Sequence, residues 1–172
     1  MLKDRAFLLR LMVVNCVLLL SCSLDRRFLA PEVIPPQAKK GVFVNPATRD
    51  TSYVLLDGPA WQPTFVDRNN MPVTKSYSVE SSVFATAEGH TLNGWTMRPK
   101  DAEANGVLIL FLHGNGGNIT TEYAVLVPLV ERGYTVFLFD YSGFGFSTGR
   151  ASRKTLVSDA RAAFAQVGAV KA

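Results

Sequence analysis

Two glycine-rich segments carry the residues whose types and spacing could support catalysis. The first is HGNGGN (113–118), which follows an apolar run and contains three glycines. Backbone N–H groups in such a loop can point into a site without side chains in the way, and they can bind the oxyanion that forms when a carbonyl is attacked. The second is DYSGFGFSTG (140–149), which follows the next apolar run. Because neither segment has the Walker lysine or GxGxxG spacing, a phosphate-binding module is the weaker interpretation. Two tight turns without a ligand are the other alternative.

The segments that precede these loops predict buried strands. The runs VLILFL (107–112) and TVFLF (135–139) are apolar without alternation, which is typical of strands covered on both faces of a sheet. Further upstream, residues 83–86 and 92–97 flank Glu88-Gly89-His90 and predict an antiparallel hairpin. Ligands of an open α/β sheet bind beyond the carboxyl ends of its strands, so both loops are expected at one edge.

Two helices are predicted around these strands. The first runs from about Thr121 to Arg132, ends at Gly133, and is kinked or shifted by Pro128. The second starts after Ser152 as N-cap, and its apolar residues fall on one face at helical spacing: Leu156, Val157, Ala160, Ala163, Phe164 and Val167. A hairpin followed by strand, helix, strand and helix predicts the α/β fold class, with a sheet covered on both faces.

The two loops in this order resemble the α/β-hydrolase superfamily, in its serine esterase, monoacylglycerol-lipase-like and serine-aminopeptidase-like branch. The resemblance covers residues 82–167 and includes the hairpin that ends LNGW (92–95). It implies the N-terminal part of a hydrolase sheet, an antiparallel hairpin followed by parallel strands with flanking helices, truncated at the end of this chain. It also implies hydrolysis of a carboxylic ester or related acyl bond by a serine nucleophile. Ser142 stands where the family usually has arginine, so a looser second loop is expected.

The resemblance also assigns roles to loop residues. Asn115 is expected to contribute an oxyanion-hole N–H, with Gly116 as its neighbour. Structural roles in the loops are expected for His113, Gly114, Asp140, Gly143 and Gly145. The hydrolase triad runs in the order Ser, acid, His, so the nucleophile, acid and base are all expected beyond Ala172, and this chain alone is expected to be inactive.

One literal G-x-S-x-G lies in the second loop, at residues 145–149 around Ser147. A nucleophile elbow needs a strand leading directly into the serine and a helix starting directly after it. Here the serine follows a glycine loop, seven residues after Asp140. Ser147 is therefore not expected to be a nucleophile, and His90, in the hairpin turn, is expected to be a solvated residue without a catalytic role.

The first residues read as a targeting signal. Lys3, Arg5 and Arg10 precede an apolar run at 11–20, followed by a small-residue boundary, which predicts a secretory signal peptide at 1–21. LLSC (19–22) resembles the lipobox of bacterial lipoproteins, which implies lipid attachment at Cys22. An uncleaved anchor is the alternative. The protein is thus expected to be exported and membrane-anchored on the periplasmic side, and Ser23 favours the outer membrane.

Length and composition limit the domain organisation of the chain. The chain has 172 residues, 48% apolar, which suffices for one domain with a core. Residues 22–75 contain seven prolines and only weak strand signals at 42–44 and 53–56, so a tether and N-terminal covering segment is expected there, followed by a partial α/β-hydrolase domain at 76–172. No internal repeat stands out.

Charge and cysteine content restrict the partners. The net charge is +4, without a basic patch interleaved with aromatics, so no nucleic-acid partner is expected. Both cysteines lie near the N-terminus, so no disulfide, metal centre or other cofactor is expected. The expected partners are the membrane, through the lipidated N-terminus, and a small acyl or ester substrate. A non-catalytic lipoprotein that uses the domain for binding is the rival hypothesis.

Overall fold

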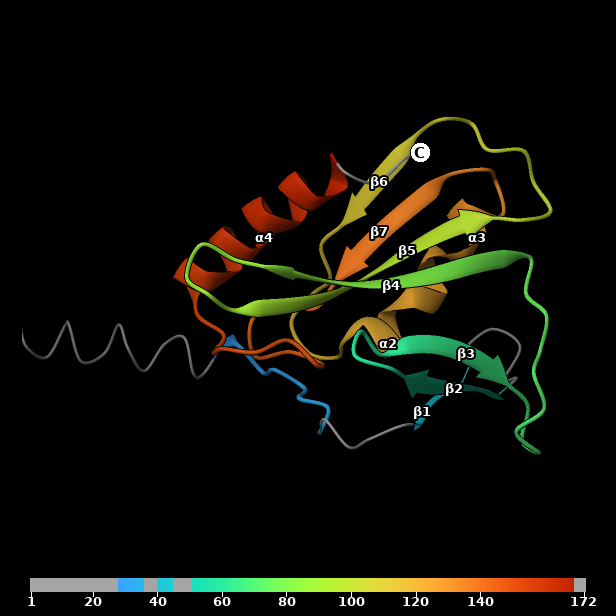
Figure 1. Ribbon diagram of the computed structural model, residues 1–172, viewed down its shortest axis with the longest axis horizontal. Helices are drawn as coiled ribbons and strands as arrows, with labels where there is room; N and C mark the ends of the chain where they lie inside the picture. Colours follow the sequence, from blue (N-terminus) through green and yellow to red (C-terminus); the bar gives the residue numbers. More distant parts are fainter. Residues whose placement is uncertain (1–27, 36–39, 45–50, 169–172) are drawn as a thin grey trace, which may run out of the picture.

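A four-stranded mixed sheet forms the centre of the molecule (Figure 1). The computed structural model describes residues 28–35, 40–44 and 51–168, so the predicted signal peptide and Cys22 lie outside the described residues. The strand order is β4-β5-β7-β6. The strands are β4 (Tyr77–Ala85), β5 (Thr91–Pro99), β6 (Leu108–Phe111) and β7 (Thr135–Phe139). β6 and β7 pair in parallel, while β5 pairs antiparallel with both β4 and β7. The predicted α/β sheet with a leading hairpin is confirmed. The prediction that 107–112 is a buried strand is wrong, because β6 lies at the edge of the sheet and is only half-buried.

The strand β7 shows why its sequence is apolar at every position. Successive side chains of a strand point to opposite faces. Val136 and Leu138 pack into one core cluster with residues of the segment that follows β6. Phe137 and Phe139 pack into a second cluster, which includes Ala163 of the last helix. All five residues of β7 are buried, because the sheet is covered on both faces here.

The single helix predicted over 121–132 is wrong. The segment instead forms three short pieces: α2 (Ile119–Glu122), a 3₁₀ turn η1 (Tyr123–Leu126) and α3 (Val127–Val130). Pro128 lies in the first turn of α3, where it has no N–H to donate to the preceding turn. The first piece also begins earlier than predicted, because Asn118 caps it through the N–H of Thr120.

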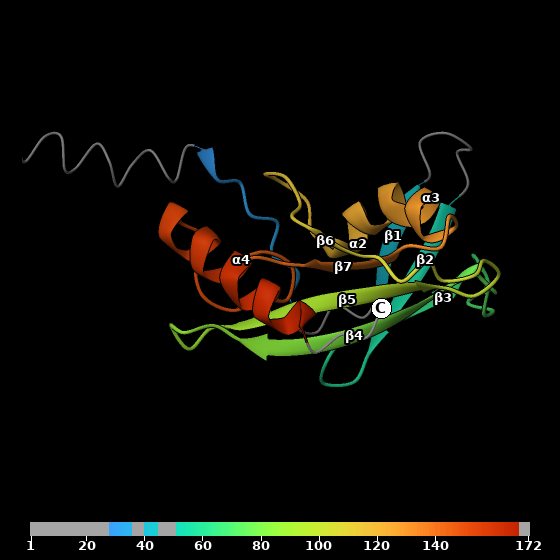
Figure 2. The same ribbon diagram turned by 90° about the horizontal axis from the view of Figure 1, so that it is seen from above.

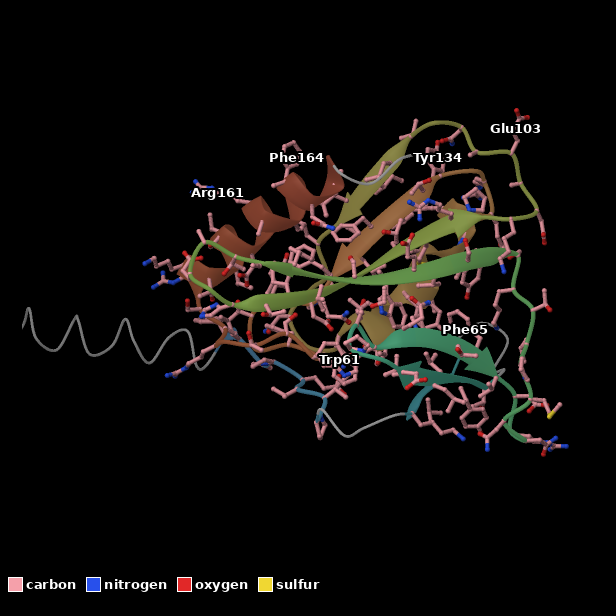
Figure 3. All side chains as sticks on the ribbon, in the orientation of Figure 1. Trp61, Phe65, Glu103, Tyr134, Arg161 and Phe164 are labelled. Carbon is pink, nitrogen blue, oxygen red and sulfur yellow. The ribbon has the colours of Figure 1, made fainter. Side chains whose placement is uncertain are left out.

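The predicted second helix is confirmed as α4 (Arg153–Val167), capped by Ser152. Figure 2 shows α2 and α3 together on one side of the strands, with α4 apart from them. Two residues assigned to the packed face of α4 are instead exposed: Val157 is 54% exposed and Phe164 is 73% exposed. Phe164 points away from the body of the molecule (Figure 3). Only part of the predicted apolar face therefore contributes to the core.

A second sheet precedes the main one and was not expected at this size. It has the order β1-β2-β3 and is antiparallel, with strands β1 (Lys40–Val44), β2 (Thr51–Asp57) and β3 (Gln62–Val66). The weak strand signals at 42–44 and 53–56 are confirmed as parts of β1 and β2, whereas the loop-like interpretation is wrong for β3. Pro63 is accommodated because β3 lies at a sheet edge, where its missing N–H breaks no ladder. Val54 and Leu56 pack into the same core cluster as Ile119 and Tyr123.

Candidate active-site loops

The two glycine-rich loops leave the sheet at the same edge. β6 and β7 are adjacent and parallel, with Phe111 paired to Leu138, so the chain after each strand emerges on one side. His113 follows β6 by two residues and Asp140 follows β7 directly. The structure thus brings together the residues that the sequence placed at one site.

Asp140 connects the two loops from the interior. Its side chain is fully buried, and its Oδ1 accepts a hydrogen bond from the backbone N–H of Ile119 at 2.8 Å. A Cβ on Gly145 would lie 1.8 Å from the other carboxyl oxygen, so the second loop can approach only because residue 145 is glycine. Burial raises the pKa of Asp140 to about 7. One carboxyl group therefore fixes the start of α2 and the path of the second loop.

His113 lies beside this carboxyl group and is also buried. Its Nδ1 donates to the carbonyl of Gly114 at 2.8 Å, which leaves Nε2 as the unprotonated nitrogen of a neutral ring. Nε2 lies 3.8 Å from Oδ1 of Asp140, too far for a hydrogen bond. Burial lowers the pKa of His113, so the neutral form dominates at neutral pH. The ring packs edge-on against Tyr141 and Phe144, as a structural histidine does.

The loop after His113 depends on glycine. Gly116 and Gly117 have φ values of 89° and 72°, a left-handed conformation that glycine adopts without strain. A Cβ on Gly117 would also lie 2.8 Å from the hydroxyl of Thr121. The loop ends at Asn118, whose side chain and backbone form a capping box with Thr121. Asn115 and Gly116, the predicted oxyanion-hole residues, thus lie between two fixed ends, and their catalytic role stays a prediction.

The side chain of Asn115 has partners that the sequence gave no reason to expect. Its Oδ1 accepts from the backbone N–H of Ala30 at 2.8 Å, and its Nδ2 donates to the carbonyl of Phe28. Ala30 and Phe28 precede Asn115 by 85 and 87 residues, so no local sequence pattern could have indicated these contacts. An N-terminal segment therefore lies against the first loop.

The structure corrects the predictions made for His90 and Ser142. His90 is half-buried rather than solvated, and its Nδ1 lies 3.0 Å from the hydroxyl of Ser142. Ser142 is fully buried: its backbone N–H and its hydroxyl donate to the two carboxylate oxygens of Asp159, at 2.7 and 2.9 Å. The second loop is thus braced by Asp159 of α4, and the looser loop expected without arginine is not observed.

This Ser–His–Asp group is not arranged as a catalytic triad. The serine hydroxyl already donates to Asp159, so its oxygen accepts from His90 Nδ1–H. In a triad the histidine lies between the acid and the serine and accepts the serine proton. Here the serine lies in the middle and the histidine is the donor. The arrangement can hold a loop in place, but it cannot activate a nucleophile.

Ser147, in the G-x-S-x-G sequence, is committed to backbone contacts. Its side chain is buried, and the hydroxyl donates to the carbonyl of Asp140 at 2.7 Å and accepts from the N–H of Asn93 at 3.0 Å. The following residues run to the N-cap of α4 without forming a helix directly after the serine. Trp61, from the β2–β3 turn, stacks on Phe146, the residue before Ser147, with ring centroids 4.6 Å apart. The geometry gives a physical reason for the prediction that Ser147 is not a nucleophile.

Within the described ranges, no group of three or more histidine, cysteine, aspartate or glutamate residues could hold a metal ion. The helices in the same part of the chain are all too short or too polar to cross a bilayer.

A sheet with a leading hairpin and parallel strands that end in two glycine-rich loops defines an α/β-hydrolase type of protein. Residues 107–168 match a family model described as "alpha/beta hydrolase fold". These matches support membership of the α/β-hydrolase superfamily.

Two curated proteins are similar to this chain over part of their length. The protein YfhR of Escherichia coli K12 is 36% identical over 89 residues, which are 51% of this chain and 31% of the relative. The α/β-hydrolase domain-containing protein aho-3 of Caenorhabditis elegans is 33% identical over 119 residues, 68% of this chain and 33% of the relative. Among solved structures, the Pyrococcus furiosus esterase Pf2001 aligns with a TM-score of 0.47 and 21% identity, over 55% of this chain and 37% of the esterase. The chain spans about a third of the length of the curated relatives it matches.

Proposed function

We propose that this chain forms the oxyanion-binding part of an α/β-hydrolase that cleaves a carboxylic ester or related acyl bond with a serine nucleophile. The observation that carries the proposal is the position of the 113–118 loop, at the carboxyl end of β6 and beside the 140–149 loop. Esters and related acyl compounds develop negative charge on the carbonyl oxygen when attacked, and preorganised backbone N–H groups stabilise that charge.

The loop has the rigidity that this role needs. His113 is held by the carbonyl of Gly114 at one end, and Asn118 caps α2 at the other. Ile119 donates to the buried Asp140, which ties the loop to β7. In the proposed mechanism, the backbone N–H groups of Asn115 and Gly116 bind the oxyanion of the tetrahedral intermediate. Loss of one such donor typically costs about 3–4 kcal/mol of transition-state stabilisation.

The nucleophile, acid and base of the proposed reaction lie outside the described residues. Ser142 and Ser147 are buried and hydrogen-bonded to groups that hold their loop. His113 is buried with its Nδ1 bonded to a carbonyl, and the Nδ1 of His90 faces Ser142. The described residues therefore place no accessible serine within reach of an available base.

The experiment is an NMR titration of the ¹⁵N-labelled chain with butyrate, the acid product of a short-chain ester. We expect the amide resonances of Asn115 and Gly116 to shift, with chloride at equal ionic strength as the control. Gly116→Ala should abolish the shifts, because φ at this residue is 89°. Gly106→Ala is the matched control, since Gly106 also has a positive φ and open surroundings but lies in another loop. Shifts confined to residues outside 113–118 would contradict the proposal.

A second candidate function is a non-catalytic binding protein. The burial of Ser147, whose hydroxyl holds a loop against β5, agrees with both functions, so the butyrate titration is what separates them. Under this alternative, butyrate leaves the amides of the first loop unchanged.

Export and lipid anchoring at Cys22 belong to the same proposal. The basic residues, the apolar run at 11–20 and the LLSC sequence support it. The protein would then act at a membrane on the periplasmic side, with the outer membrane favoured by Ser23.

A further inference from the structure

Residues 28–34 form a strap that contacts both glycine-rich loops. Figure 1 shows this segment, in blue, beside the 140–149 loop. The strap reaches the second loop at Val33, which forms a parallel bridge with Gly145. There the N–H of Gly145 donates to the carbonyl of Glu32, and the N–H of Ile34 donates to the carbonyl of Gly145, both at 2.8 Å. The contact is a single rung of β-sheet pairing between segments more than a hundred residues apart.

The strap reaches the first loop through one side chain. The carboxamide of Asn115 accepts from the N–H of Ala30 and donates to the carbonyl of Phe28. A carboxamide presents an acceptor and a donor side by side. It therefore bonds the carbonyl of one residue and the N–H of the second residue after it, as a neighbouring strand would.

The two contacts follow one pattern. Asn115 binds the carbonyl of residue 28 and the N–H of residue 30, and Gly145 binds the carbonyl of residue 32 and the N–H of residue 34. Alternate residues of an extended chain present their backbone groups on one edge. Four even-numbered residues of the strap thus supply the contacted groups, with helical backbone at Phe28 and a strand-like bridge at Val33.

The two loops bind backbone groups of the strap rather than its side chains. Phe28 is 67% exposed and Val33 is 62% exposed, while Ile34 is the strap residue that packs against the core. Position 145 must be glycine, because a Cβ there would collide with the carboxyl group of Asp140. We propose that Asn115 and Gly145 form a docking site for one extended polypeptide segment, and that residues 28–34 occupy this site in cis.

The strap can leave without disturbing the sheet. It is held chiefly by two backbone–backbone hydrogen bonds, two hydrogen bonds to the carboxamide of Asn115 and two partly buried side chains, Leu29 and Ile34. Segments with few apolar contacts open locally before the rest of a protein unfolds. Once open, the site presents the same donors and acceptors to an extended peptide from another chain. The occupant lies beside the 113–118 loop, but the proposal is independent of any hydrolytic function.

The test uses the full chain with Ala30→Pro and Ile34→Pro, which remove both N–H donors of the strap. The probe is a fluorescent peptide with the sequence FLAPEVIP (residues 28–35), and anisotropy gives its affinity. In the unmodified chain the strap competes at high effective concentration. We therefore expect the double variant to bind the peptide at least tenfold more tightly. Glu32→Ala with Val33→Ala, which keeps the backbone donors, should behave like the unmodified chain.

Modified peptides and a second substitution test the hydrogen-bond pattern. N-methylation of the peptide at its Ala30 and Ile34 positions should reduce binding at least tenfold, whereas N-methylation at Val33, on the other edge, should change it less than threefold. In the double variant, Asn115→Ala should weaken binding at least fivefold, with Asn69→Ala as the matched control on another loop. Equal affinity of the unmodified chain and the double variant, or indifference to N-methylation, overturns the proposal.

If the double variant does not fold, amide hydrogen exchange tests whether Asn115 and Gly145 hold the strap. In the unmodified chain, the amides of Ala30 and Ile34 should exchange more slowly than that of Val33. Asn115→Ala should remove the protection of Ala30 and leave that of Ile34. Equal exchange at the three residues would show that the strap is not held by these groups and would overturn the proposal.

Discussion

Asp140 has a buried carboxyl group that serves two loops and titrates near neutral pH. Its ordinary pKa of 3.8 is raised to about 7 by burial. Between about pH 4 and 7 the folded protein therefore binds a proton here that the unfolded chain does not bind. Stability decreases as pH rises through this window, by up to about 1.4 kcal/mol per pH unit, and this contribution is constant above it.

His113 has the opposite effect on how stability depends on pH. Burial lowers its pKa from 6.5, so the unfolded chain binds the proton more readily than the folded protein. Stability from this group is lost as pH falls below about 6.5. The two side chains lie 3.8 Å apart, so their titrations are coupled and the pH profile belongs to the pair.

We predict that Asp140→Asn removes the decrease in stability between pH 4 and 7. The amide oxygen can still accept from Ile119, so the fold should persist. The His113 contribution then remains, and stability should rise with pH up to about 6.5. Urea midpoints at several pH values measure this, with Asp57→Asn, at an exposed position, as the control that keeps the original profile. Parallel profiles for Asp140→Asn and the unmodified chain would contradict the prediction.

Ser147 gives a prediction that separates structure from catalysis. Ser147→Ala leaves the buried N–H of Asn93 and the carbonyl of Asp140 without their partner, which should cost about 1–3 kcal/mol. Ser76→Ala, which removes an exposed hydrogen bond to Glu131, should cost less than about 0.5 kcal/mol. Chemical unfolding measures both changes.

The same variant tests whether Ser147 is reactive. A fluorophosphonate probe should label neither the unmodified chain nor Ser147→Ala, because the hydroxyl is buried and lacks a base. Labelling that disappears in Ser147→Ala would identify this serine as a nucleophile.

Among the elements, α4 depends strongly on its N-terminus. Of its 15 residues, only Asp159 and Ala163 are buried, so packing contributes modestly to its stability. Ser152 accepts from the N–H of Thr155, and the side chain of Thr155 accepts from the N–H of Ser152. This reciprocal cap satisfies two backbone donors that the helix leaves free.

We predict that Ser152→Ala destabilises the protein by about 1 kcal/mol, the usual contribution of such a cap. Phe164→Ala, at a 73% exposed position within the same helix, should be neutral or stabilising, since alanine is the better helix former. Thermal unfolding followed by circular dichroism compares the two variants. An unchanged midpoint for Ser152→Ala would mean that α4 is held by its packing instead.

The success of sequence-based prediction differed among the elements for physical reasons. The strand β7 was predictable because burial on both faces requires an apolar residue at every position. The break in the 119–130 segment was only partly predictable: Pro128 signals an interruption, but the 3₁₀ turn before it follows from packing. The strand β3 was missed because its proline is tolerated only at a sheet edge, and its edge position depends on pairing with β2.

The candidate site was likewise only partly predictable from the sequence. The positions of His113 and Asp140 followed from the strands that precede them. The bracing of Ser142 by Asp159 did not, because the two residues lie 17 apart on different elements, and His90 is 52 residues away. The contact between Asn115 and Ala30 spans 85 residues. Side-chain partners set by tertiary structure leave no local pattern.

At the scale of the whole molecule, the structure brings the N-terminal region to the candidate site. The strap at residues 28–34 contacts both glycine-rich loops, and the second sheet shares a core cluster with the residues of α2 and η1. Cys22 precedes Phe28 by six residues, which can span at most about 20 Å. A lipid on Cys22 would therefore hold the candidate site close to a membrane surface.

The last prediction concerns this anchor. In bacterial cells supplied with labelled palmitate, the chain should incorporate label, and Cys22→Ser should abolish the incorporation. Cys16→Ser is the matched control, because Cys16 lies within the apolar run of the predicted signal peptide and would be removed with it. Cys22→Ser would remove the lipid, so the mature variant should also fractionate less with membranes than the unmodified protein. Equal labelling of the unmodified chain and Cys22→Ser would contradict lipid attachment at this residue. Membrane association that persists in an unlabelled, uncleaved chain would instead support an anchor formed by the first residues themselves.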